Sequence, residues 1–72
     1  MKLRPLKRRE VVRILKRNGY ERDPEHDVRG SHEMWWNPKT KRMFPLPTYA
    51  EFGVPLLSLI IRESGIPREE FV

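Results

Sequence analysis

The chain has 72 residues, of which 38% are hydrophobic, and it contains no cysteine. Without cysteine, neither a disulfide framework nor a thiolate zinc site can stabilise it, which excludes secreted disulfide scaffolds. The length also excludes large nucleotide-binding enzymes, and we expect a single domain over residues 1–72 with a core over about 6–66. No apolar run approaches the roughly 18 residues of a membrane span, so a cytoplasmic location is expected.

The net charge is +5, and the basic residues are concentrated at one end of the chain. Residues 1–22 hold nine Lys or Arg and two Glu, whereas residues 43–72 hold two basic and four acidic residues. Each phosphate that a cation neutralises releases condensed counterions, so a basic end of this kind attracts polyanions. The charge pattern is compatible with nucleic-acid binding and also with a solvated basic helix face.

The first expected element is a basic amphipathic helix over residues 6–18. Its apolar side chains recur at helical spacing, and Gly19 follows at the position where a left-handed residue ends a helix. Residues 20–22 can begin a short strand, and the proline-containing acidic segment 23–27 is typical of a turn. The start of the chain therefore predicts a helix, a short strand and a turn.

A β-hairpin is expected in the middle of the chain. Residues 28–36 form a β-like stretch, residues 37–41 form a loop with Asn-Pro, and residues 42–46 resume an extended pattern. Pro45 and Pro47 place the second strand at a sheet edge, because proline cannot donate to a β-ladder. Alternation puts His32, Met34 and Trp36 on one face of the first strand, and the residues between them on the other.

A second helix is expected to begin at Pro55 and to end at Gly65, because apolar residues repeat at three and four positions between them. Residues 67–72 add a short C-terminal turn. The order of helix, three short strands and helix predicts an α+β domain with a small antiparallel sheet.

His32 is the strongest candidate for chemistry. An imidazole gives and takes protons near neutral pH, and cleavage of an RNA phosphodiester needs such a group together with cations that stabilise the phosphoryl charge. The cations expected to come close to His32 across the hairpin are Arg29, Lys39, Lys41 and Arg42. His26 and His32 match no familiar metal-ligand spacing, and no nucleotide-binding motif is present, so neither a metal nor a cofactor is expected.

The chain resembles the HicA (YcfA-like) toxin family of toxin–antitoxin systems over residues 6–71. The resemblance rests on the order of four features: the basic helix ending in Asn-Gly-Tyr, Gly30-Ser31-His32, Pro47, and the helix ending in Ser-Gly-Ile. It implies an α-β-β-β-α fold like that of double-stranded-RNA-binding domains, with a three-stranded antiparallel sheet and both helices on one face.

The resemblance also implies a function. It implies a metal-independent endoribonuclease that cleaves mRNA and arrests translation, and a HicB-type antitoxin that binds and masks the toxin. His32 corresponds to the catalytic histidine, and Gly30 and Ser31 correspond to the turn that positions it. Trp35 would join the core and leave His32 exposed, and Glu33 stands where many members have a second histidine. Lys7 and Arg8 of the basic helix are added to the four hairpin cations as expected RNA-binding residues.

Two other functions remain open. The first is a non-catalytic RNA-binding module that uses the basic helix and a stacking aromatic side chain. The second is a protein-interaction domain whose basic face meets an acidic partner. Cleavage of RNA in the presence of EDTA, and its loss in His32→Ala, separate the nuclease from both.

Overall fold

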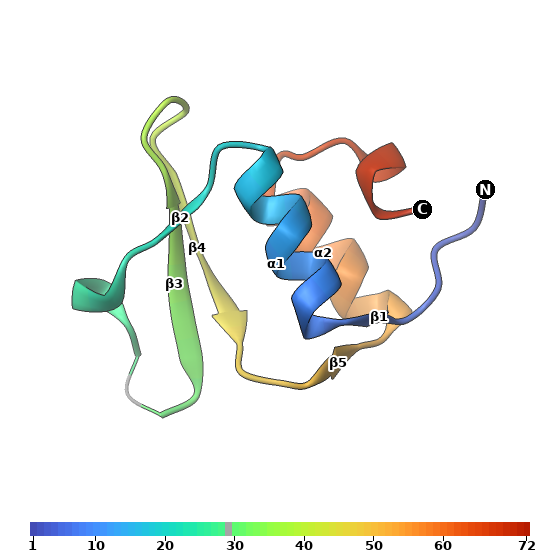
Figure 1. Ribbon diagram of the computed structural model, residues 1–72, viewed down its shortest axis with the longest axis horizontal. Helices are drawn as coiled ribbons and strands as arrows, with labels where there is room; N and C mark the ends of the chain where they lie inside the picture. Colours follow the sequence, from blue (N-terminus) through green and yellow to red (C-terminus); the bar gives the residue numbers. More distant parts are fainter. Residues whose placement is uncertain (29) are drawn as a thin grey trace.

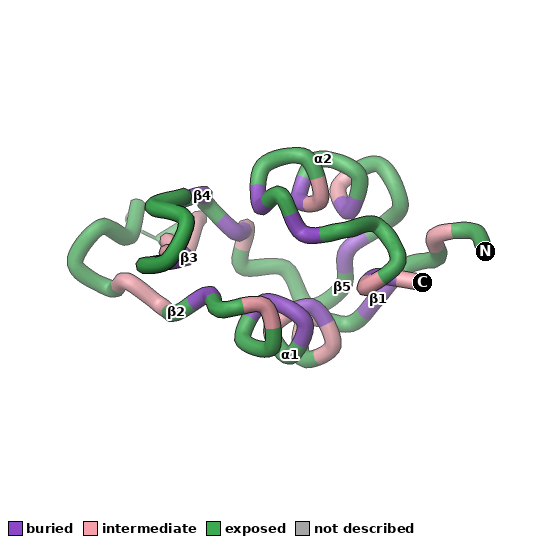
Figure 2. The backbone as a smooth tube through the Cα atoms, turned by 90° about the horizontal axis from the view of Figure 1, so that it is seen from above, coloured by how far each residue is buried: buried purple, intermediate pink, exposed green. Residues whose placement is uncertain are grey.

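The computed structural model describes residues 1–28 and 30–72. In chain order its elements are β1 (Leu6–Lys7), α1 (Arg8–Arg17), β2 (Glu21–Arg22), the 3₁₀ helix η1 (Pro24–His26), β3 (His32–Asn37), β4 (Arg42–Pro47), β5 (Glu51–Phe52), α2 (Val54–Ser64) and the 3₁₀ helix η2 (Arg68–Phe71). Both helices lie on the same side of the β3–β4 hairpin in two perpendicular views (Figures 1 and 2). Two helices and a three-stranded antiparallel sheet confirm the predicted α+β class and are consistent with an α-β-β-β-α arrangement.

Both helices end at the predicted glycines. Gly19 follows Asn18, the C-cap of α1, and has φ +91°, and Gly65 ends α2 with φ +72°, a region that costs glycine little. The backbone N–H of Gly65 donates to the Ile61 carbonyl at 3.1 Å, which satisfies one of the last carbonyls of α2. Pro55 lies in the first turn of α2, as expected.

The start of α1 differs from the prediction. The helix was expected from Leu6, but Leu6 and Lys7 form β1, which pairs antiparallel with β5 in a separate two-stranded sheet. The helix therefore begins at Arg8, and the Glu10 carboxylate accepts a hydrogen bond of 3.0 Å from the Lys7 N–H. Leu6 lies opposite Phe52, and both side chains are buried. This small sheet therefore packs the segments that precede α1 and α2 against the core.

The main sheet has the strand order β2–β3–β4, all antiparallel. As predicted, β4 is an edge strand. Pro45 pairs with Met34. The Met34 N–H donates to the Asp27 carboxylate, and the Met34 carbonyl accepts the Asp23 N–H, so both Met34 groups point to the β2 side. The Pro45 nitrogen therefore faces the open edge of β4, where its missing N–H costs no ladder hydrogen bond.

The first hairpin strand begins later than predicted. A β-like stretch was expected from Val28, but β3 starts at His32, and Val28 makes only an isolated bridge to His32. Gly30 has φ +80°, and the Ser31 and His32 N–H groups both point to the Val28 carbonyl, at 3.4 and 3.3 Å. These hydrogen bonds precede β3 and fix the position from which the His32 side chain projects.

The core lies between the hairpin and the two helices, where the purple segments of Figure 2 meet. Trp35 of β3 and Phe44 of β4 face each other across the ladder and are buried, and the buried Tyr20 packs edge-on against Phe44 with ring centroids 5.3 Å apart. The remaining buried hydrophobic residues are Leu6, Val11, Ile14, Leu15, Leu46, Phe52, Leu57, Ile60, Ile66 and Phe71. No helix within residues 1–28 and 30–72 has the length and apolar character of a membrane span.

Candidate active site

His32 is the first residue of β3 and lies on the face that points away from the helices. The buried partner on the other face is Trp35, as the resemblance implied, and alternation then directs His32, Met34 and Trp36 outward. Their cross-strand neighbours on β4 are Pro47, Pro45 and Met43 in that order. We call these six residues the outer face of the hairpin. His32, Met34 and Trp36 are half-buried there, and Met43 is 38% exposed.

The His32 ring has one close partner, the hydroxyl of Ser31. The distance from Nδ1 to Ser31 Oγ is 3.1 Å, and no described residue bonds Nε2. When Nδ1 accepts the hydroxyl proton, Nε2 carries the ring proton; when Nδ1 donates, Nε2 is the acceptor. Either tautomer leaves Nε2 able to exchange a proton with a molecule on the outer face.

Arg8 is the predicted cation that the fold brings to the same end of the hairpin. Its Nη1 donates to the carbonyl of Pro47, the cross-strand neighbour of His32, at 2.9 Å. Its Nη2 donates to the carboxylate of Glu33, and a quarter of each side chain remains exposed in this ion pair. Arg8 thus ties the start of α1 to both strands beside His32.

A second arginine completes this network. Arg22 of β2 binds Asp27 through two hydrogen bonds of 2.7 and 2.8 Å, and its Nε lies 3.7 Å from Glu33 Oε1. Asp27 Oδ1 also accepts the backbone N–H of Met34 at 2.8 Å. The hydrogen bond from Arg22 and the one from Met34 lower the pKa of Asp27 to about 2, so this carboxylate stays ionised near neutral pH. Neither Arg22 nor Asp27 was predicted, because their roles depend on a two-residue strand whose pairing leaves no sequence signal.

The hairpin-loop cations do not approach His32, contrary to the expectation from sequence. In the ladder His32 pairs with Pro47, whereas Arg42 pairs with Asn37 at the opposite end, roughly 16 Å along the strand. Arg42 Nη1 donates to the Glu63 carbonyl at 3.1 Å, and Lys41 Nζ lies 5.6 Å from the centre of the Trp36 ring. Lys39 is an exposed residue of the loop between β3 and β4. Arg29, the fourth predicted cation, lies outside the described residues.

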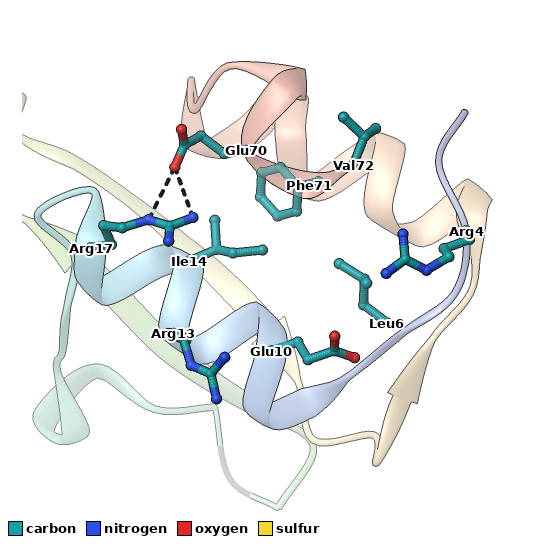
Figure 3. A pocket seen from close by; sticks show the side chains of 9 residues that line it. All are labelled: Arg4, Leu6, Glu10, Arg13, Ile14, Arg17, Glu70, Phe71 and Val72. Atoms are coloured by element: carbon teal, nitrogen blue, oxygen red, sulfur yellow. Dashed lines mark hydrogen bonds and ion pairs between the residues drawn. The ribbon is translucent and has the colours of Figure 1, made fainter. Parts of the chain in front are cut away.

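Two hollows lie beside α1. An open one at the start of the helix is lined by Lys7, Arg8, Arg9, Val12 and Ala50, so it contains the two RNA-binding residues predicted on α1 and adds Arg9. A smaller cavity of about 150 Å³ lies between α1 and the two chain ends (Figure 3). Its arginines include Arg17, which is paired with Glu70 at 3.1 Å, and no residue of the hairpin lines it. The first hollow is therefore the one that adjoins the His32 end of the hairpin.

Among the described residues, no group of three or more His, Cys, Asp or Glu side chains is arranged to hold a metal ion. The model of the family described as "HicA toxin of bacterial toxin-antitoxin" matches residues 8–66. The chain belongs to the HicA toxin family. No curated protein and no solved structure matches it.

Membership of the HicA family makes this chain the toxin of a toxin–antitoxin system, and such a system pairs a toxin with an antitoxin. The match runs from the first residue of α1 to just beyond α2, and so includes His32, Arg8 and Glu33. In this HicA chain the position after the predicted catalytic histidine holds Glu33, whose carboxylate faces Arg8 and Arg22 and points away from the outer face. Glu33 is therefore part of the network that holds the strand start in place.

Proposed function

We propose that this toxin is a metal-independent endoribonuclease that cleaves mRNA and so arrests translation in the cytoplasm. The observation that supports it is the placement of His32 on the outer face of the hairpin, at the end that Arg8 ties to the start of α1. A proton-transfer group thereby lies at the same end of the hairpin as the hollow at the start of α1 that Lys7, Arg8 and Arg9 line. A phosphodiester backbone needs this combination of a titratable ring and fixed positive charge.

His32 acts as general acid or base in the cleavage step. As a base, its imidazole takes the proton of the ribose 2′-OH while O2′ attacks phosphorus, and the bond from phosphorus to O5′ breaks. In this case the departing O5′ takes its proton from water. The products of this step are a 2′,3′-cyclic phosphate and a 5′-hydroxyl, and the step consumes no water. In a second step, water hydrolyses the cyclic phosphate. As an acid, the protonated ring gives its proton to the departing O5′, and water takes the proton of the 2′-OH. The Ser31 hydroxyl holds the ring from Nδ1, which leaves Nε2 for this transfer, and Gly30 supplies the turn before it.

The basic residues bind the RNA backbone. Lys7 and Arg8 lie nearest to the His32 end, and Lys39, Lys41 and Arg42 lie at the far end of the hairpin, so the RNA extends along β3 from one group to the other. Arg29 is proposed as an RNA-binding residue from its position in the sequence alone. Each phosphate contact makes binding more sensitive to salt. A HicB-type antitoxin is the proposed protein partner that masks His32.

The test is RNA cleavage by the purified chain in EDTA, with His32→Gln as the variant. Glutamine keeps polar side-chain atoms but transfers no proton near neutral pH, so we expect cleavage to fall by about 100-fold or more while the fold is unchanged. Analysis of the RNA ends distinguishes this mechanism, because it leaves a 5′-hydroxyl. His26→Gln is the matched control, since His26 lies in η1, bonds Asp23 and should retain full activity. Full cleavage by His32→Gln, or cleavage that EDTA abolishes, would contradict the proposal.

The same experiment separates the second candidate, a non-catalytic RNA-binding module. That function is favoured by Lys41 and Trp36, a cation over an aromatic ring on the outer face. It predicts salt-sensitive RNA binding that His32→Gln does not change, with no cleavage by the unmodified chain.

A further inference from the structure

One aromatic side chain on the outer face has no role in the core. Trp36 is half-buried, lies on the same face as His32 and is four residues further along β3. Its cross-strand neighbours are Met43 of β4, which is 38% exposed, and Glu21 of β2, which is also exposed. A tryptophan ring kept at the surface of so small a domain is available to a binding partner.

The charge beside the ring indicates what kind of partner it is. Lys41 Nζ lies 5.6 Å from the centre of the Trp36 ring, and Lys39 is exposed in the same loop. Asp and Glu are absent from residues 34–50, so the hairpin itself places only positive charge beside the ring, and the nearest acidic residue across the sheet is the exposed Glu21 of β2. Single-stranded nucleic acid presents flat bases and negative phosphates in alternation, which is the complement of that surface.

The distance to His32 fits the same ligand. Four residues of extended strand separate the two side chains by about 13 Å, a length that a stretched single strand covers in a few nucleotides. Met34, an uncharged side chain, lies between them on the same face of β3. A base held at Trp36 would fix the register of the chain at His32.

We propose that Trp36 is a stacking platform for one nucleobase of single-stranded RNA, with Lys41 binding the adjoining phosphate, and that it sets which phosphodiester reaches His32. This rests on the proposed ribonuclease function and adds a positioning residue to it. A ring stacks on any base but most strongly on a purine, so the platform favours a purine a few nucleotides from the cleaved bond.

The experiment measures binding, which does not depend on cleavage. The probes are a 12-nucleotide 2′-O-methyl oligoadenylate, which lacks the 2′-OH that cleavage requires, and a strand of the same backbone without bases. We expect Trp36→Ala to bind the oligoadenylate about 5- to 100-fold more weakly, because one base loses its stacking partner. The abasic strand should bind both proteins equally, and Trp36→Phe should restore most of the loss. Met43→Ala, which changes the neighbouring side chain on the same face, is the control and should alter binding less than about twofold.

The outcomes separate this inference from the proposed function. If the unmodified chain binds neither strand, the RNA function itself fails. If the unmodified chain binds and cleaves RNA but Trp36→Ala binds oligoadenylate with unchanged affinity, only the stacking platform is wrong. Loss of antitoxin binding in that variant would then assign the Trp36 ring to a protein contact. If Trp36→Ala does not fold, the unmodified chain and Trp36→Phe are compared instead. Tighter binding of the oligoadenylate than of the abasic strand by both proteins supports the stacking platform. Equal binding of both strands by the unmodified chain also overturns the proposal.

Discussion

Glu33 of β3 binds the guanidinium of Arg8 at the start of α1, although 25 positions separate the two residues. Arg8 is one of the residues proposed to bind RNA, and within the chain its guanidinium contacts Glu33 and the Pro47 carbonyl. A cation held in this way is fixed in place but has part of its charge neutralised by its partner. The Arg8–Glu33 pair therefore has two effects: it holds the start of β3 against α1, and it reduces the positive charge that Arg8 presents to RNA.

The first prediction concerns Glu33→Gln. Removal of the carboxylate leaves the full charge of Arg8 for a phosphate, so RNA should bind more tightly at low salt. The slope of log affinity against log salt concentration should steepen by about one, as for one added phosphate contact. The pair is a quarter exposed, so the free energy of unfolding should fall by less than about 1 kcal/mol. Binding of 2′-O-methyl RNA at several salt concentrations measures the first two effects, and urea unfolding measures the third.

Glu69→Gln is the matched control, because Glu69 lies exposed in η2 and the change removes the same charge. If both variants gain the same affinity, net charge explains the result and the Arg8–Glu33 pair has no specific effect on RNA.

The second prediction concerns Asp27 at low pH. Its pKa is about 2 in the folded chain against an ordinary 3.8, because Arg22 and the Met34 N–H bond the ionised form. The ionised carboxylate therefore stabilises the fold above about pH 4, and this contribution is lost as the pH falls toward 2. Asp27→Asn should be less stable than the unmodified chain at pH 7, and the two should converge near pH 2. Urea midpoints at both pH values measure this, with the exposed Glu25→Gln as the control; an equal difference at both values would show that the charge of Asp27 is not the cause.

Much of the secondary structure could be predicted because its signals are local. Gly19 and Gly65 end the helices because a left-handed residue after an apolar repeat is a signal confined to a few positions. Pro45 identifies an edge strand by the same kind of reasoning, since it lacks a donor. Alternation alone leaves open whether Trp35 or Trp36 faces the helices; the resemblance to the HicA family implied that it is Trp35, and Trp35 is buried.

The site was harder to predict, because it depends on which ends of the elements meet. Lys39 and Arg42 are close to His32 in sequence, yet the register places them at the other end of the hairpin. Arg8 is distant in sequence, yet α1 begins where β3 begins, and β1 pairs with only two residues of β5 to bring this about. A two-residue strand has no periodicity to detect, so neither that pairing nor the start of α1 at Arg8 could be predicted.

The third prediction concerns Tyr20, whose hydroxyl donates to the Ser64 carbonyl at 2.5 Å inside the core. Tyr20→Phe removes this hydrogen bond and should lower the free energy of unfolding by about 1 kcal/mol. Burial raises the pKa of Tyr20, and the nearby Arg42 only partly opposes it. Because the neutral form is favoured in the folded chain, the stability that Tyr20 contributes is complete below pH 10 and is lost as the pH rises beyond it.

Unfolding curves at pH 8 and above pH 10 test this, with Tyr49→Phe as the control because Tyr49 is 58% exposed. Tyr20→Phe should lose less stability than the unmodified chain between the two pH values, whereas Tyr49→Phe should follow the unmodified chain. A Tyr20→Phe variant as stable as the unmodified chain at pH 8 would mean that the hydrogen bond contributes nothing.

The fourth prediction concerns Lys41, the one described non-glycine residue with a positive φ, at +65°. Its N–H donates to the Asn37 carbonyl at 2.8 Å, so the hairpin turn holds this residue in the left-handed region, which costs a residue with a Cβ atom about 1 kcal/mol. Lys41→Gly should therefore be more stable than Lys41→Ala by about that amount, although both remove the same charge. Thermal unfolding measures the difference. Lys39 lies in the same turn without a positive φ, so Lys39→Gly should be no more stable than Lys39→Ala. If Trp36 and Lys41 hold RNA together, both Lys41 variants bind it equally weakly, which separates the strain of the turn from the charge that it presents.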